Sequence, residues 1–384
     1  MRDPKAYAAA GRNDPLSDPQ RREHPYDFVS LPDRPAEKRT AVGHDRYPAD
    51  RLTGSITLVY RALMPLHVGS GVFETAENCG LEGGVRPVRG IVRLGGRPTL
   101  PGSSWKGAVR ARFEAITASR LGLAARGGRE PAFKVPAALK EPGAPDKGQY
   151  SIDLRDPRLD ALKPVMVRKP HDLDRLSPAE ALFGAMGYRG RVLPGEGRIG
   201  GPSAGHPLAL APLDSPVPHR LAKPGKIERT GRQKLTIQEV EGRKFYYDGE
   251  IVHERRTEFA GNVRFSSEDI DVVPAGSTIT LDVRLESVTD DELGALLIAA
   301  GYGEHGGVTR LGGFKPVGLG KVELTSVEPA LHRGPELRRF QRPDPVALDL
   351  ATIVQQAIGG LVEPERLREL REVTTRRRPP EVKR

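Results

Sequence analysis

The sequence predicts an α+β fold, a split β-α-β sandwich of the ferredoxin or RRM kind that is enlarged by large insertions. The first observation is the order of the regular segments: strand, loop, helix, insertion, strand, strand, helix, glycine-rich loop and strand. The second is composition, because only 37% of the 384 residues are hydrophobic while 44 are glycine and 35 are proline. Much of the chain must therefore be loops, tails or insertions around a modest core.

The N-terminal part predicts an arm followed by the first core strand. Residues 1–52 are rich in Pro, Asp, Arg and Lys with almost no apolar periodicity, so we expect an extended or disordered arm. Residues 55–65 alternate in polarity and predict a strand with Ile56, Leu58 and Tyr60 on one face.

A glycine-rich loop and a basic hairpin follow this strand. Residues 67–71 read His-Val-Gly-Ser-Gly, and residues 72–98 form a longer loop. Within that loop, imperfect alternation over 84–94 predicts a hairpin. The arginines of this hairpin are Arg86, Arg89 and Arg93.

The segment 103–121 predicts an amphipathic helix. Pro101-Gly102 forces a turn, and Ser103 or Ser104 can cap the first free amides of the helix. The apolar residues that recur at helical spacing, and would face a core, are Trp105, Val109, Phe113 and Ile116.

Cations on another face of this helix predict a grip for phosphate. Lys106 and Arg110 lie one turn apart, next to amides that already favour an anion. A Walker loop is excluded because Ser103, not lysine, follows Gly102, and no glycines flank the serines as a nucleophile elbow requires. The segment therefore favours a polyanion, although an ordinary capped amphipathic helix explains it equally well.

Two insertions occupy the middle of the chain. Residues 122–176 are irregular, basic and punctuated by proline, with a short helix expected near 159–162. Residues 177–180, Ser-Pro-Ala-Glu, predict the start of another helix. The composition shifts again over 192–258, which has many Pro, Gly and basic residues.

One segment of the second insertion interleaves cations with aromatic residues. It reads Gly-Arg-Lys-Phe-Tyr-Tyr and contains Arg243, Lys244 and Tyr246. Such interleaving stacks on bases or grips phosphates, and it is as common in strands that pack their aromatic residues on a core.

Regular structure resumes in the last third of the chain. The predicted elements are strands at 259–265, 277–288 and 322–327, a helix at 289–300 capped by Thr289, and a glycine-rich loop at 309–321. The tail after Pro329 predicts helices at 344–358 and 364–372 and ends in the basic run 376–378.

Charge and cysteine content narrow the function classes. The formal net charge of +10 indicates a polyanionic partner, of which nucleic acid fits best, although ribosome-like and membrane-surface proteins share this balance. The single cysteine, Cys79, excludes an internal disulfide and a cysteine-cluster zinc site. No segment resembles a secretory signal or a membrane span, so we expect a soluble, cytoplasmic protein.

Five motifs together resemble one protein family. They are HVGSG, LPGSSWKGAVRARFEA, ALFGAMGYRGRV, GNVRFSSEDI and LGGFKPVGLGKVEL. In this order they resemble RAMP-superfamily CRISPR-associated proteins, and the chain most resembles the backbone subunit of type III effector complexes. The GRKFYY segment is similar to a stretch of a multi-RAMP subset linked to type III-D-like systems. The resemblance covers roughly 53–120, 177–192 and 242–328.

The resemblance implies an RRM-like RAMP domain at 53–328 with a C-terminal tail at 329–384. It implies CRISPR RNA, target RNA and other RAMP subunits as partners, with no membrane. The hairpin after the first strand would be a thumb that kinks the guide–target duplex, while phosphate contacts position the RNA without reading its sequence. The expected RNA-binding residues are Gly69, Gly71, Arg86, Arg89, Ser103, Ser104, Lys106, Arg110, Arg243, Lys244, Tyr246, Gly312, Gly313, Lys315 and Gly318.

A departure from the family pattern bears on catalysis. Members that cut target RNA carry an aspartate in the loop after the first strand, and no aspartate occurs between 67 and 98 here. Glu82 could replace it in holding Mg²⁺ or orienting the attacking hydroxyl, although Val85 stands at the best-matching position. His67 could serve as a general acid or base, but a loop histidine more often hydrogen-bonds a backbone group. Apart from this possible Mg²⁺, we expect no cofactor.

Three functions are consistent with the sequence. The leading one is a non-catalytic or weakly catalytic RNA-binding backbone subunit of a type III-like antiviral CRISPR complex. The second is a metal-dependent endoribonuclease subunit that cuts target RNA at regular intervals. The third is a generic basic RRM-like RNA-binding scaffold.

Overall fold

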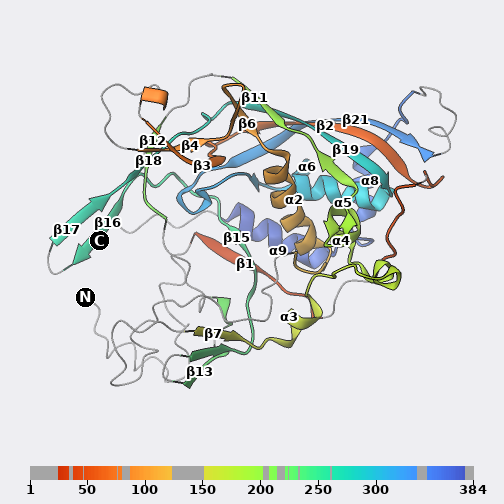
Figure 1. Ribbon diagram of the computed structural model, residues 1–384, viewed down its shortest axis with the longest axis horizontal. Coiled ribbons are helices and arrows are strands. Elements are labelled where there is room, and N and C mark those ends of the chain that lie inside the picture. The colour runs from red at the N-terminus through yellow and green to blue at the C-terminus, as the bar shows by residue number, and fades with distance from the viewer. Residues whose placement is uncertain are drawn as a thin grey trace.

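A computed structural model describes the chain from residue 25 to residue 376 with internal gaps (Figure 1). The described ranges are 25–33, 38–45, 47–75, 77–79, 87–122, 151–201, 207–213, 221–223, 225–231, 234–259, 262–334 and 344–376. Among these residues, no helix is long and apolar enough to cross a lipid bilayer.

An eight-stranded sheet forms the centre of the molecule. Its order is β20-β21-β2-β19-β11-β6-β5, and β10 also pairs with β19. The bounds are β2 Leu52–Ala62, β5 Arg93–Leu94, β6 Arg97–Leu100, β10 Val192–Pro194, β11 Gly197–Gly200, β19 Thr278–Val288, β20 Thr309–Arg310 and β21 Lys321–Arg333. The core of this sheet has the spatial order β21, β2, β19 and then β10 with β11. Along the chain these are the fourth, first, third and second core strands, and all neighbours are antiparallel. With one helix after β2 and one after β19, this confirms the ferredoxin-like prediction.

The second core strand differs from the prediction. The sequence places it at 259–265, whereas the structure uses β10 and β11, which lie inside the predicted insertion 192–258. Both strands are short and rich in Gly and Pro, so they lack the alternation that predicts a strand. Phe259 and residues 262–265 instead belong to a separate antiparallel pair of strands, β16, Arg255–Phe259, and β17, Asn262–Ser266.

Helices cover one face of the central sheet (Figure 1). They are α2 Gly102–Ile116, α5 Asp290–Ala300, α8 Leu350–Ala357 and α9 Pro364–Thr375, with the short α6 Gly303–Gly306 after α5. The predicted inward residues of the first strand and helix, among them Leu58 and Trp105, are fully buried in one core. The two predicted tail helices exist as α8 and α9, and their apolar residues belong to the same core.

Buried hydrogen bonds fix α2 against the sheet. The indole Nε1 of Trp105 donates to the Tyr60 hydroxyl at 2.9 Å, and that hydroxyl donates to the carbonyl oxygen of Ala300 at 3.0 Å. Arg112 donates to the carbonyl oxygens of Ala299 and Val308, each at 2.9 Å. A cation at the C-terminus of α5 complements the partial negative charge there. These bonds set the rotation of α2 and therefore the direction of its other side chains.

The start of α2 corrects the predicted serine cap. The helix begins at Gly102 with Pro101 as the preceding residue, and no side chain caps it. Ser103 and Ser104 therefore lie within the first turn instead of in front of it. The first residue of the helix, Gly102, has to be glycine because a Cβ there would collide with the carbonyl oxygens of Pro194 and Gly195.

A four-stranded sheet of order β12-β18-β4-β3 follows the end of β2. Its strands are β3 Gly69–Glu74, β4 Val88–Ile91, β12 Leu208–Leu210 and β18 Glu268–Ile270, with the 3-10 turn Glu77–Cys79 after β3. The predicted hairpin at 84–94 is corrected, because β4 pairs with β3 and the tight hairpin joins β5 to β6. Gly95 and Gly96, both with positive φ, make that tight turn.

Segments of both insertions form a small three-stranded sheet with its own apolar cluster (bottom of Figure 1). Its elements are β7 Ser151–Leu154, α3 Pro157–Ala161, β13 Ile227–Gly231 and β14 Lys234–Ile237. Along the chain, the elements between α3 and β10 are the 3-10 helix Pro170–Arg175, α4 Pro178–Phe183, β8 Gly184–Ala185 and β9 Tyr188–Arg189. The predicted start of α4 is confirmed by a capping box between Ser177 and Glu180.

Part of the predicted N-terminal arm forms a strand. β1, Tyr26–Ser30, pairs antiparallel with β15, Gly242–Tyr246, and the ribbon packs against α9. Ser30 donates to the Glu369 carboxylate of α9 at 2.8 and 2.9 Å. The proposed division into arm, domain and tail stays a prediction.

Candidate nucleic-acid interface

The two glycine-rich loops lie against each other although they are far apart in the sequence. The Gly313 amide donates to the carbonyl oxygen of His67 at 2.7 Å, and the Gly320 amide donates to that of Pro65 at 2.8 Å. Gly312 has φ of +74°, and a Cβ there would collide with the His67 carbonyl oxygen. Only glycine adopts this positive φ and approaches the carbonyl oxygen this closely without strain, which explains the glycine at this contact.

His67 is held inside this contact. Its side chain is 4% exposed, Nδ1 lies 2.8 Å from the carbonyl oxygen of Asp271, and the ring of Phe314 meets it edge-on at 5.1 Å. A carbonyl partner requires Nδ1 to carry the proton. Burial lowers the pKa of His67, so the neutral ring is favoured. This environment favours a positioning role for His67, and its predicted acid–base role stays a prediction.

Gly69 and Gly71 belong to the exposed edge strand β3. Phe73 of this strand is 57% exposed, and the Arg89 guanidinium lies 5.1 Å from its ring centroid. Arg89 also pairs with Glu268 at 2.6 Å. The strand thus presents flexible backbone and an aromatic face at the surface, next to a cation that already has a carboxylate partner.

Lys315 is a half-buried cation that pairs with no carboxylate among the described residues. It begins the 3-10 turn Lys315–Val317 inside the second glycine-rich loop. Burial lowers the pKa of its ammonium group, and the nearby Arg310 lowers it further. Within the described part of the chain, no carboxylate pairs with Lys315. The backbone of Gly318 in the same loop closely approaches that of Glu250.

Lys106 on α2 has the same character. Burial lowers the pKa of its ammonium group, and Arg110 one turn later lowers it further. No carboxylate among the described residues pairs with it. Ser103 beside it is exposed and Ser104 is half-buried. An anion here would compensate a charge that the protein leaves uncompensated.

Arg110 and Arg243 are not free cations. Arg110 Nε donates to Glu114 at 2.6 Å and its Nη1 to the carbonyl oxygen of Gly184 at 3.0 Å. Arg243 from β15 binds the other carboxylate oxygen of Glu114, which is buried. This Glu114 cluster, formed by Glu114, Arg110 and Arg243, joins α2 to the β1–β15 ribbon. The cluster directs both guanidinium groups to a protein carboxylate.

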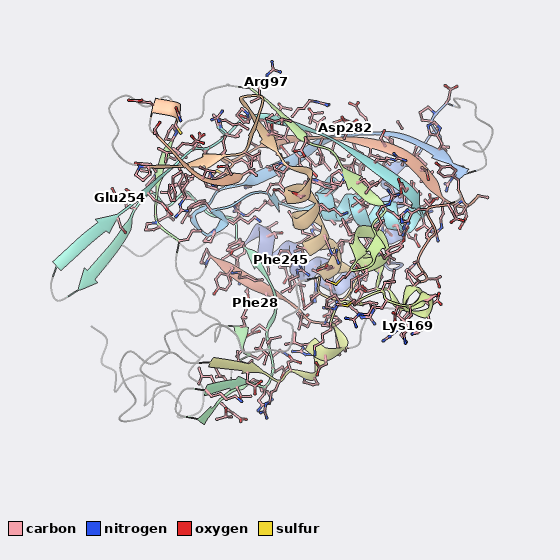
Figure 2. All side chains as sticks on the ribbon, in the orientation of Figure 1. Phe28, Arg97, Lys169, Phe245, Glu254 and Asp282 are labelled. Carbon is pink, nitrogen blue, oxygen red and sulfur yellow. The ribbon has the colours of Figure 1, made fainter. Side chains whose placement is uncertain are left out.

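The outer face of the β1–β15 ribbon carries aromatic side chains. Lys244 is exposed, and its Nζ lies 4.8 Å from the ring centroid of Tyr26 and 5.1 Å from that of Tyr246. Phe28, opposite Lys244 in the ribbon, lies on the same face (Figure 2). Phe245 points to the other side and packs against the main core. The sequence reading missed Tyr26 and Phe28, whose short alternation inside a polar arm was the available signal.

Other predicted positions lie outside the described residues or remain unassembled. Glu82, Arg86 and Val85 are outside the described ranges. Among the residues that are described, no group of three or more His, Cys, Asp or Glu side chains is placed to hold a metal ion. The Mg²⁺ of the nuclease hypothesis stays a prediction.

The open face of the central sheet does not resemble an RRM platform. Its side chains alternate with the buried ones and include Thr57, Arg61 and Asp282 (Asp282 is labelled in Figure 2). Arg61 pairs with Glu323 across the strands at 2.7 Å, and Thr57 donates to Asp282 at 2.7 Å. RRM domains stack bases on aromatic residues at this face. The outward residues of β2, β19 and β21 include no aromatic side chain, so an interface here would have to use other contacts.

The match to one protein-family model agrees with the motifs. The model of the RAMP superfamily matches residues 59–323, which include both glycine-rich loops, α2 and most of the central sheet. One of the solved structures similar to the chain is titled "Type IV-B CRISPR Complex"; it has 17% sequence identity and a TM-score of 0.32, over 72% of this chain and 90% of that chain. No curated protein sequence matches the chain.

Proposed function

The chain belongs to the RAMP superfamily, and from this premise we propose that it binds the phosphate backbone of a CRISPR RNA as a backbone subunit of an effector complex. The type III-like assignment of that complex rests on the motif resemblance. Target RNA and other RAMP subunits would be its further partners, with the β3–β4 hairpin as the thumb that shapes the guide–target duplex.

The observation that carries the proposal is the pair of uncompensated lysines. Lys106 and Lys315 each stand in one of the five motifs that resemble the superfamily, and both have lowered pKa values because burial removes water from the charge. Keeping such a charge without a counter-ion costs free energy. A phosphate diester would supply the missing negative charge without contacting the bases.

The aromatic face of the β1–β15 ribbon supports a second contact. Tyr26 and Tyr246 flank the Lys244 ammonium group, and Phe28 packs edge-on against Tyr26. Such a combination of cation and aromatic rings stacks on unpaired bases of any sequence. Sequence-tolerant stacking and phosphate binding together suit a guide RNA, whose sequence changes from one complex to the next.

The test is RNA binding by the purified chain, measured by fluorescence anisotropy over a series of salt concentrations. Replacing Lys106 or Lys315 with Gln should weaken binding of single-stranded RNA about tenfold, because a charged hydrogen bond to phosphate is lost. The slope of log affinity against log salt should become shallower by about 0.7 for each lysine. The loss should be equal for RNAs of different sequence.

Matched controls separate specific contacts from general charge. Lys163→Gln removes the same charge from an exposed lysine that pairs with Asp160 on α3, and Arg243→Gln removes a cation of the Glu114 cluster. Both should leave RNA affinity within about twofold of the wild type. Equal losses in the lysine variants and the controls would refute the assigned contacts.

A further inference from the structure

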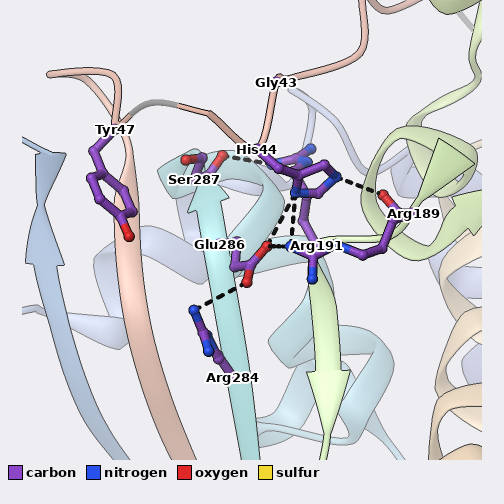
Figure 3. Close-up of a pocket in the computed structure, with 8 residues that line it drawn as sticks. All are labelled: Gly43, His44, Tyr47, Arg189, Arg191, Arg284, Glu286 and Ser287. Carbon is purple, nitrogen blue, oxygen red and sulfur yellow. Dashed lines mark hydrogen bonds and ion pairs between the residues drawn. The ribbon is translucent and has the colours of Figure 1, made fainter.

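A polar pocket of about 180 Å³ lies at the end of the sheet opposite the glycine-rich loops (Figure 3). Its lining residues are Gly43, His44, Tyr47, Arg189, Arg191, Arg284, Glu286 and Ser287. β2 spans 11 residues between this end and the loops, so the two sites are about 30 Å apart. The length of β2 therefore separates the pocket from the proposed RNA contact at Lys315.

The GYRGRV motif and a bulge in β19 build this pocket. The motif supplies Arg189 and Arg191, whose role the RNA proposal does not explain. The pairing of β19 with β2 shifts register after Leu285, and Ser287 has a φ of +51°, which is costly for a residue other than glycine. The Ser287 amide donates to the Thr53 hydroxyl at 2.8 Å, which holds the bulge in place. Glu286 lies on the same face of β19 as Arg284 and contacts the arginines.

Arg191 forms the rigid wall of the pocket. It is 1% exposed in its side chain, and its guanidinium group binds the Glu292 carboxylate at 2.9 and 2.5 Å. The same group donates to the carbonyl oxygens of Ser287 at 2.6 Å and Ala181 at 3.0 Å. Glu292 therefore compensates the charge of Arg191 from behind the pocket.

The remaining lining charges have an excess of cations. Arg284 lies 3.2 Å from one Glu286 oxygen, while Arg189 and, at 3.1 Å, His44 contact the other. Arg189 and Arg284 are 57% and 63% exposed in their side chains. A guanidinium group has five N–H donors, and the contacts within the described chain use one nitrogen of each arginine. Two open guanidinium groups thus share one carboxylate.

We propose that this pocket binds a phosphate group. Arg189 and Arg284 would donate their unused N–H groups to its oxygens, since guanidinium groups match phosphate geometry. The volume accommodates one phosphate with ordered water, and the lining is polar. The ligand is either free phosphate or the phosphate of a nucleic acid. This inference stands on the pocket alone and is independent of the RNA contacts proposed above.

Isothermal titration of the full chain with inorganic phosphate tests the proposal. Arg284→Gln should weaken phosphate binding about tenfold through loss of a charged hydrogen bond. Glu286→Gln should instead strengthen it several-fold, because the competing carboxylate loses its charge. The matched control is Arg198→Gln, which removes an arginine that is 70% exposed and paired with Asp282 on the open sheet face. It should bind phosphate as the wild type does.

Two RNA trinucleotides, with and without a 5′-phosphate, identify the source of the ligand. A loss of affinity in Arg284→Gln for the 5′-phosphorylated trinucleotide alone supports a terminal phosphate, and an equal loss for both supports a backbone phosphate. Loss for inorganic phosphate only supports a free ion. The proposal is overturned if phosphate does not bind the wild type, or if Arg284→Gln and Arg198→Gln bind it equally. The proposal is also overturned if the wild type self-associates without binding phosphate and Arg284→Gln loses this self-association. The pocket would then bind a carboxylate of a second copy of the chain.

Discussion

The Glu114 cluster and the lysines Lys106 and Lys315 differ in what surrounds their cations. In the cluster, one buried carboxylate binds Arg110 of its own helix and Arg243, which is 129 residues away in the sequence. At Lys106 and Lys315, burial lowers the pKa of the ammonium group and no described carboxylate compensates it. The basic residues of both regions look alike in the sequence. Of these half-buried cations, the two lysines without a described carboxylate partner are therefore the candidates for a polyanion, and the two arginines serve the contact with Glu114.

Lys106 and Arg110 show this difference within one helix. They are one turn apart, yet the longer Arg110 side chain reaches Glu114 and the carbonyl oxygen of Gly184, whereas Lys106 reaches neither. Lys106 would therefore contribute to RNA binding, and Arg110 would contribute to the stability of the fold. Three experiments test whether the two residues differ in this way.

The largest effect should come from Glu114→Gln. The neutral amide leaves Arg110 and Arg243 without their shared charge partner, so the free energy of unfolding should fall by about 3 kcal/mol. Urea denaturation measures this value. The control Glu323→Gln breaks the exposed pair with Arg61 and should cost less than about 0.5 kcal/mol. Equal losses in both variants would show that the cluster contributes no more than a surface pair.

A smaller effect should appear in the pH dependence of RNA affinity. RNA binds the protonated lysines, whose pKa values are lowered in the free protein, so affinity should be constant at low pH and fall as pH rises through those values. The expected loss is about fivefold for each lysine that deprotonates. Anisotropy with an RNA of adenine and cytosine avoids titration of the bases themselves.

Lys106→Arg provides the control for this pH profile. Arginine stays protonated across the alkaline range, so this variant should keep its affinity to higher pH than the wild type. If the two profiles coincide, the titration of Lys106 does not contribute to binding.

The smallest effect should be seen when Lys106 and Arg110 of α2 are each replaced by Met, because the two changes should shift the free energy of unfolding in opposite directions. Lys106→Met removes a charge that burial disfavours and should raise the free energy of unfolding by up to about 0.5 kcal/mol at neutral pH. The gain should vanish as pH rises, because a lysine with a lowered pKa destabilises the fold only while it is protonated. Arg110→Met should lower the same quantity by about 1–2 kcal/mol, since Glu114 loses a partner. Differential scanning calorimetry at two pH values compares the variants, and a loss in both would contradict the division.

Elements with local signals were predictable from the sequence. The capping boxes at Thr289 and Ser177 mark α5 and α4 to within a residue, and the alternation of residues 277–288 coincides with β19. The order of these elements was sufficient for the ferredoxin-like fold. The contact between the two glycine-rich loops was not among the predictions, because it joins segments far apart in the chain.

The amphipathic elements and the family motifs could be predicted from the sequence, because these signals depend on residues within one or two turns of each other, and the excess of positive charge follows from composition. The fold determined that β10 and β11 complete the core sheet and that β1 pairs with β15. It also decided that Arg243 binds Glu114 and that Arg189, Arg191 and Arg284 share one pocket. Strand pairing and ion pairing join segments far apart in the chain, and their free energies depend on burial and distance. The spacing of residues in the sequence contains neither burial nor distance. It therefore identifies the cations, but their ion-pair partners are seen only in the folded structure.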